Sequence, residues 1–392
     1  MQKERLWTGS FFAACGANFM MFFAFYMLLP ILPMYLADQF AVTRSTAGLI
    51  LSSYTIMALL FRPFAGFMVD SFPRKPLLLI CYTFFISYFG GYMLAGALAV
   101  FAILRATHGM AFGMVTVSVN TMAIDIMPAS RRGEGIGYYG VSTNLAMAIG
   151  PMAALMIHEA TPNYDWVFGT ALGVGLLGLF IASRIKGGKT QIVGAKQTIS
   201  LDRFLLLKGI PGAITTIFLS FAYGVLSTYV AVYGTDEIGL TGGTGMFFVC
   251  LSGGLVVSRL ISGQLINRGY LTQVSKMGIS LLIASFLCFV LFKIPAVFYA
   301  CGVAIGVGYG LLCPTLQTMF INLAQHNQRG TANATYLTSW DFGVGAGVLL
   351  GGVIAQHTSY SWAFTLGTIL LCIGLTLFFL WAGPYFDRNK LR

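Results

Sequence analysis

Residues 62–75 read Arg62-Pro63-Phe64-Ala65-Gly66-Phe67-Met68-Val69-Asp70-Ser71-Phe72-Pro73-Arg74-Lys75. Arg62, Gly66 and Asp70 recur every four residues, which places them on one face of a helix. The pattern returns 197 positions later, where the chain reads Arg259-Leu260-Ile261-Ser262-Gly263-Gln264-Leu265-Ile266-Asn267-Arg268. The chain therefore contains two halves that are built alike.

The composition excludes a water-soluble globular protein. Of the 392 residues, 57% are hydrophobic and only 9% are charged, whereas a soluble domain has about 25% charged residues. A helix crosses a bilayer with about 20 apolar residues, and the chain has twelve such segments with short connections. We expect an all-α integral membrane protein whose twelve transmembrane helices cover residues 8–36, 45–69, 76–96, 98–124, 135–159, 164–184, 209–234, 244–266, 275–292, 296–324, 331–355 and 361–382.

These segments divide into two groups of six. We expect an N-terminal bundle over residues 1–184, a polar and basic cytoplasmic linker over 185–208, and a C-terminal bundle over 209–392. Because six is an even number, both halves enter the membrane in the same direction and form parallel repeats, with a possible site at their interface. Alternating access uses this arrangement, whereas a channel or a membrane enzyme does not require it.

The net charge of +11 reflects topology rather than binding to nucleic acid. With a cytoplasmic N-terminus, the ends and the even-numbered connections hold 18 of the 23 Lys and Arg residues. The positive-inside rule then places both termini in the cytoplasm, and we expect a multi-pass protein of a bacterial inner membrane.

Several kinds of chemistry lack a sequence signal. The seven cysteines lie in apolar segments without a CxxC pair, so neither a disulfide framework nor a metal site is indicated. No GxxxxGK[ST] stretch occurs, which argues against direct use of ATP. No nucleophile and base stand out as a set. We therefore expect no enzymatic activity and no cofactor.

The motifs resemble those of the major facilitator superfamily and, within it, the twelve-span drug:proton antiporters. Residues 66–75 are similar to the loop motif between helices two and three, with Ser71 and Pro73 in place of the usual arginine and glycine. Residues 104–109 read Leu104-Arg105-Ala106-Thr107-His108-Gly109 and are similar to the fourth-helix motif, with histidine where glutamine is usual. Gly150-Pro151 matches part of the antiporter motif of helix five.

The resemblance implies a conformational latch formed by Gly66, Asp70, Arg74 and Lys75. In the family, the aspartate holds the outward-open state by meeting the start of helix eleven, here near Thr331. The residues themselves support the contact, since glycine permits close helix approach and a carboxylate is stabilised at the positive end of a helix. The alternative is a solvated turn that follows the charge topology.

Asp341 is the strongest candidate for proton coupling. Counting from Thr331 at about 1.5 Å per residue puts it about 15 Å deep, near the middle of the membrane. Burial there favours the neutral form, so the carboxyl group can exchange a proton in the physiological range. Its partner in the repeat is Asn144, which has the same shape and cannot titrate. The alternative is that Asp341 is permanently paired and structural.

Arg105 and His108 are a second candidate pair, one helical turn apart. The resemblance implies a part in proton coupling for Arg105. An arginine at this depth can also fix a substrate carboxylate, tune a nearby acid, or form an ion pair. His108 can titrate near neutral pH, but a hydrogen-bonded packing role is an equal alternative.

Several residues are candidates for lining a substrate cavity, although lipid-facing aromatic residues are equally expected. They are Asn18, Tyr26, Asn144, Tyr223 and Tyr229. The expected partners are a small-molecule substrate, protons and the lipid bilayer, and a design of two bundles favours a monomer.

We expect a proton-coupled secondary transporter that exports small amphipathic or lipophilic compounds. Two alternatives stay open. One is a specific transporter of a metabolite such as a sugar or an organic anion, with Arg105 as the anion anchor. The other is a membrane receptor or scaffold that transports nothing and tolerates the loss of Asp341, Arg105 and Asp70.

Overall fold

The computed structural model describes residues 5–42, 44–161, 163–186, 202, 204–241 and 244–391, and within these ranges every regular element is a helix. The long helices are α1 (Gly9–Phe40), α2 (Arg44–Ser71), α3 (Arg74–Met93), α4 (Leu98–Ile126), α5 (Arg132–Ala160), α6 (Tyr164–Ser183), α7 (Ile210–Asp236), α8 (Met246–Asn267), α9 (Leu271–Leu291), α10 (Pro295–Leu323), α11 (Arg329–His357) and α12 (Tyr360–Leu377). Twelve helices among the described residues are long and apolar enough to cross a membrane. The predicted all-α, twelve-span class is confirmed.

Helix ends differ from the hydropathy-based spans where polar residues continue a helix. We expected the first span to stop at residue 36, but α1 continues to Phe40, and the Tyr164 hydroxyl donates a hydrogen bond to Asp38 in this last turn. The helix ends at Ala41, whose φ of 49° is left-handed and lets its N–H bond to the Ala37 carbonyl. A short helix, α13 (Gly383–Asn389), follows α12 through a π-helical turn at Phe378–Ala382.

Most of the linker expected over 185–208 lies outside the described residues, which here comprise 185–186, 202 and 204–208. No structural statement about residues 187–201 or 203 follows.

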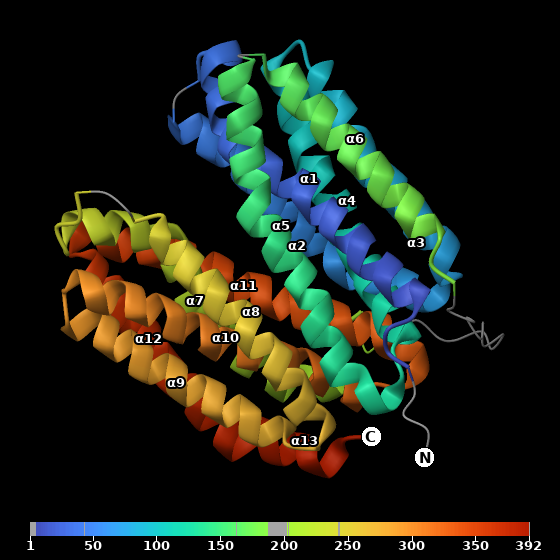
Figure 1. Ribbon diagram of the computed structural model, residues 1–392, viewed down its shortest axis with the longest axis vertical. Coiled ribbons are helices and arrows are strands. Elements are labelled where there is room, and N and C mark those ends of the chain that lie inside the picture. The colour runs from blue at the N-terminus through green and yellow to red at the C-terminus, as the bar shows by residue number, and fades with distance from the viewer. Residues whose placement is uncertain are drawn as a thin grey trace. The chain divides into compact units, whose positions relative to one another are not determined.

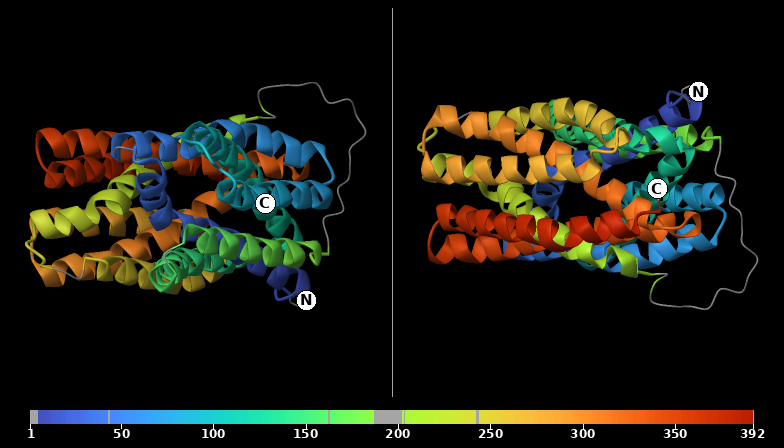
Figure 2. Two further views of the ribbon diagram at one scale, coloured as in Figure 1. Left: turned by 90° about the horizontal axis from the view of Figure 1, so that it is seen from above. Right: turned by 90° about the horizontal axis from the view of Figure 1, so that it is seen from below.

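The chain forms two compact units. Unit 1 comprises Met1–Ala129, Tyr139–Phe204 and Arg329–Ala334, and unit 2 comprises Ser130–Tyr138, Leu205–Gln328 and Thr335–Arg392. In unit 1, α1 and α3 pack on α6, and α2 and α3 pack on α4. In unit 2, α7 and α9 pack on α12, and α8 and α9 pack on α10 (Figures 1 and 2). The two units therefore use the same helix pairs, as expected of an internal repeat.

Glycine permits the closest of these contacts at matched positions. A Cβ atom on Gly109 of α4 would lie 2.1 Å from the Tyr54 carbonyl oxygen of α2, and one on Gly306 of α10 would lie 2.1 Å from the Leu251 carbonyl oxygen of α8. Gly306 follows Gly109 by 197 positions, and Leu251 follows Tyr54 by the same number. Only a residue without a side chain allows backbones to approach this closely.

Candidate functional site

Asp70 caps a helix that is remote in sequence. The first N–H groups of an α-helix have no hydrogen-bond partner within the helix, and the Gln328 side chain, which precedes α11, makes no capping hydrogen bond. Asp70 Oδ1 accepts from the Gly330 N–H at 2.9 Å, and Oδ2 accepts from the Thr331 N–H at 2.8 Å and from Thr331 Oγ1 at 2.9 Å. The carboxylate also lies at the positive end of the α11 dipole. Asp70, Gly330 and Thr331 all belong to unit 1.

Two glycines bring α2 against this first turn of α11. A Cβ atom on Gly66 would lie 2.7 Å from the Ala334 Cβ and 3.1 Å from the Thr331 Cα. A Cβ atom on Gly330 would lie 2.9 Å from both the Gly66 carbonyl oxygen and Asp70 Oδ1. The glycines therefore set the distance at which Asp70 reaches the helix end.

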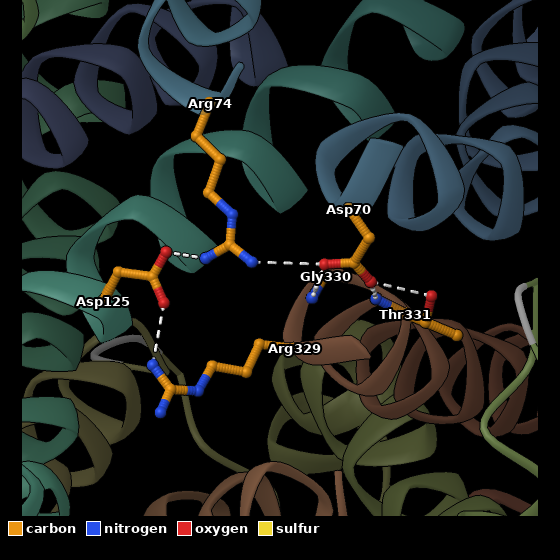
Figure 3. Close-up of polar contacts among 6 residues, drawn as sticks. All are labelled: Asp70, Arg74, Asp125, Arg329, Gly330 and Thr331. Atoms are coloured by element: carbon orange, nitrogen blue, oxygen red, sulfur yellow. Dashed lines mark hydrogen bonds and ion pairs between the residues drawn. The ribbon is translucent and has the colours of Figure 1, made fainter. Parts of the chain in front are cut away.

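A buried chain of alternating charges extends from this cap. We define the charge cluster as Asp70, Arg74, Asp125 and Arg329 (Figure 3). Arg74 donates to Asp70 at 3.3 Å and pairs with Asp125, which accepts from Arg329 at 2.9 Å. The four side chains are only 2–5% exposed. Their charges balance, and removing one partner from such a group costs about 3–5 kcal/mol because a buried charge is left unpaired.

Asp125 is a member of this cluster that the sequence analysis missed. It lies one residue beyond the expected span 98–124. The available signal was an acidic residue on the side of the expected spans where basic residues predominate. Lys75, included in the predicted latch, is half-buried and makes no ion pair among the described residues. Its place in the latch stays a prediction.

The second half of the chain contains a related contact with a different distribution of charge. Asn267, at the end of α8, accepts from the Glu134 N–H and donates to Glu134 Oε2, both at 3.4 Å. Arg131 holds the same carboxylate with two bonds of 2.9 and 2.7 Å. These residues belong to unit 2. The acid here lies at the start of α5, whereas in the first contact it lies at the end of α2.

Arg105 and His108 are brought together inside an aromatic cluster of unit 1. The Arg105 guanidinium carbon lies 4.0 Å from the centre of the Tyr54 ring. His108 is fully buried, and its Nδ1 lies 2.8 Å from the Tyr92 hydroxyl. Its ring is stacked on Tyr88 at 4.9 Å.

Asn18 joins α1 to α5 rather than facing open space. Its side chain is 1% exposed. It donates to Ser142 and Thr143, each at 2.8 Å, and accepts from the Tyr139 hydroxyl at 2.7 Å. The amide thus has both donors and its oxygen engaged, which gives it a structural role in packing.

The other cavity candidates lie in different surroundings. Asn144 is buried and its Nδ2 has no hydrogen-bond partner. Tyr26 is half-buried beside the Phe22 and Phe25 rings. Tyr223 packs on Tyr309 and Trp340, while the Tyr229 hydroxyl donates to the Val348 carbonyl at 2.6 Å. The last contact makes Tyr229 part of the packing of α7 on α11.

Asp341 is a half-buried residue of α11 in unit 2. It acts electrostatically on Tyr336, and Arg259 acts on the same tyrosine. No group of three or more metal-ligating side chains occurs in the part of the chain that the structure describes.

Comparison with known families gives a match over most of the chain. The family model described as Major Facilitator Superfamily matches residues 14–293 and 269–391.

Similar proteins and structures cover most of the chain at low sequence identity. The quinolone resistance protein NorA of Staphylococcus aureus strain MRSA252 is 24% identical over 86% of this chain and 87% of its own. The staphylopine export protein of S. aureus strain Mu50 is 22% identical over 92% and 93%. The structure of the human organic anion transporter MFSD10 has a TM-score of 0.79 at 16% identity and covers 94% of this chain and 99% of its own. The E. coli fucose:proton symporter FucP has a TM-score of 0.81 at 14% identity, over 95% and 98%.

Proposed function

Since this chain belongs to the Major Facilitator Superfamily of membrane transporters, we propose that it is a proton-coupled exporter of small amphipathic or lipophilic compounds that works by alternating access. The Asp70 cap on α11 supports the alternating-access part of this proposal. It joins residues 260 positions apart through three hydrogen bonds, and such bonds can open while both helices stay intact. A transporter that alternates between two states uses a polar contact of this kind to stabilise one of them.

The direction of transport is inferred from the names of relatives. One is a quinolone resistance protein and another is a staphylopine export protein. Both names concern small molecules, and the second names export. We propose that the present chain also exports small molecules. We further propose that it is a monomer in a bacterial inner membrane, that both termini are cytoplasmic, and that it uses no cofactor and catalyses no chemical reaction.

Asp341 is the proposed proton carrier. It combines a titratable group with partial burial on a long membrane helix, and the matching position of the repeat holds the neutral Asn144. Protonation of Asp341 from the outer side would favour one conformational state, and substrate would compete with that proton. We assign Arg105 and His108 of unit 1 to proton coupling as well. Arg105 would contribute a permanent positive charge.

The test is proton movement in proteoliposomes on addition of lipophilic cations, neutral drugs, sugars or organic acids. We expect the wild type to exchange protons with lipophilic compounds and Asp341→Asn to lose this exchange while it folds normally. Asp236→Asn is the matched control, because Asp236 is exposed in the same unit. Undiminished proton exchange in Asp341→Asn would contradict the assignment of Asp341 as the proton carrier.

A specific metabolite transporter is the second candidate, and the burial of Arg105 favours it, because a buried arginine can anchor an organic anion. Proton movement with one sugar or acid alone would support this candidate. A receptor or scaffold is the third, and it would retain its activity when Asp341, Arg105 and Asp70 are replaced together.

A further inference from the structure

Arg105 is a buried charge for which no carboxylate partner is present among the described residues. The side chain is 3% exposed, and neither Nε nor Nη1 has a hydrogen-bond partner. Arginine stays protonated in proteins, so it cannot avoid the cost of burial by losing its proton. An uncompensated buried charge is strongly unfavourable. An anion beside the guanidinium would offset this cost.

Two further unpaired groups surround the same site. The Tyr54 hydroxyl and His108 Nε2 are buried without a hydrogen-bond partner. The Arg105 guanidinium lies over the Tyr54 ring, and the His108 ring meets that ring edge-on at 5.3 Å. The three side chains come from α2 and α4, and those of Arg105 and His108 both lie against the Tyr54 ring.

His108 can complete this set of donors. The Arg105 N–H groups and the Tyr54 hydroxyl can all donate hydrogen bonds. His108 Nδ1 lies 2.8 Å from the Tyr92 hydroxyl. In the tautomer in which Nδ1 accepts from that hydroxyl, Nε2 carries the proton and is a further donor.

We propose that Tyr54, Arg105 and His108 form a binding site for an anionic group, which we assign to a carboxylate of the transported compound. Buried donors in folded proteins are paired in the great majority of cases, and a cluster of orphan donors indicates an absent acceptor. A carboxylate has two acceptor oxygens and suits the fork of an arginine. This assignment rests on the proposed function and narrows its substrates to carboxylic acids and zwitterions.

The surroundings indicate the rest of the ligand. Phe25 and Phe112 are stacked or tilted against Tyr54, and Phe85 and Tyr88 pack on His108. Such rings favour an aromatic or apolar body next to the anionic group. The rings also enclose the donors, so a ligand reaches them when part of this packing opens.

The test compares an acid with its neutral amide. Binding of naphthoate and naphthamide to purified protein is measured by isothermal titration calorimetry in wild type, Arg105→Met, Tyr54→Phe and Arg184→Met. Arg184 is the matched control, because it also lies over an aromatic ring of unit 1, at 4.6 Å from Phe180, but is exposed.

We expect wild type and Arg184→Met to bind the acid at least about tenfold more tightly than the amide, as a charge-assisted hydrogen bond would give. Arg105→Met should bring this ratio to about one, and Tyr54→Phe should weaken acid binding by about three- to tenfold. A ratio that survives in Arg105→Met overturns the site, as does failure of the wild type to distinguish acid from amide or to bind either.

Thermal unfolding without ligand separates this role from a structural one. An uncompensated buried charge destabilises the free protein, so Arg105→Met should unfold at the same or a higher temperature than wild type. A clear fall in melting temperature indicates that Arg105 is already paired, and contradicts the proposal.

A titration with chloride identifies the source of the anion. One outcome is that chloride stabilises the wild type but not Arg105→Met, and that naphthoate does not compete with chloride. This outcome supports a site for a free inorganic anion and contradicts the substrate assignment. The proton-flux assay is independent of these measurements. Transport without acid selectivity overturns only the anion site, while acid selectivity that depends on Arg105, without transport, overturns only the proposed transport.

Discussion

Asp70 uses both carboxylate oxygens, and each of them faces an N–H group. Oδ1 accepts from Gly330 and Arg74, and Oδ2 accepts twice from Thr331. An amide of the same shape offers one oxygen and turns an NH2 group toward donors. The negative charge, rather than the size of the side chain, therefore makes this contact possible.

Asp70→Asn should lower the free energy of unfolding by about 2–4 kcal/mol. The amide leaves N–H groups at the start of α11 without an acceptor and removes a negative charge that balances the charge of Arg74. Thermal unfolding of the purified protein measures the effect. Asp165→Asn, at an exposed residue of the same unit, serves as control. Equal melting temperatures for the two variants would show that Asp70 does not stabilise α11.

At the level of helices, glycine decides how close α2 comes to α11. Alanine at position 66 would place a Cβ atom 2.7 Å from the Ala334 Cβ and 3.1 Å from the Thr331 backbone. Neither neighbour is the end of a flexible side chain, so the helix start itself must move. That movement lengthens the hydrogen bonds to Asp70.

Gly66→Ala should therefore destabilise the protein by about 1–3 kcal/mol through overpacking. The matched control is Gly173→Ala in α6, where no atom lies within 4 Å of the added Cβ. This control should be neutral or stabilising by up to about 1 kcal/mol, because alanine is the better helix former. If both variants melt alike, the close contact in the structure does not limit stability.

At the scale of the whole molecule, one contact between helix ends occurs twice. The acidic residue lies on one helix in the first copy and on the other helix in the second. Asp70 meets Thr331 in unit 1, and the matching residues Asn267 and Glu134 meet in unit 2. Each pair has one carboxylate and one neutral side chain. The repeat has thus kept the charge of the contact while moving it from one helix to the other.

A double-mutant cycle tests this exchange. Asn267→Asp alone places a second carboxylate about 3.4 Å from the Glu134 carboxylate and should cost about 1–2 kcal/mol by repulsion at a partly exposed site. Adding Glu134→Thr recreates the residue types of the first contact and should recover most of that loss. Thermal unfolding of the four proteins gives the coupling energy. Additive effects would mean that the two positions do not interact.

Much of the architecture was predictable from the sequence, for a local reason. A membrane span must satisfy its backbone hydrogen bonds within itself, so a run of apolar residues is sufficient to predict a helix. The 197-residue repeat likewise predicted which glycines and which ends of helices correspond. The ends at Phe40 and Leu271 were missed because hydropathy does not register a polar helical turn.

The sequence by itself thus determined the twelve spans, the repeat and the helix face that carries Gly66 and Asp70, because each depends on residues a few positions apart. The tertiary structure alone decided the partners: Asp125 with Arg329, 204 positions away, Asn18 with α5, and Arg105 among aromatic rings. A charged or polar side chain reveals in the sequence that it needs a partner. Which group meets that need depends on helix packing, and packing is set by contacts that are remote in the chain.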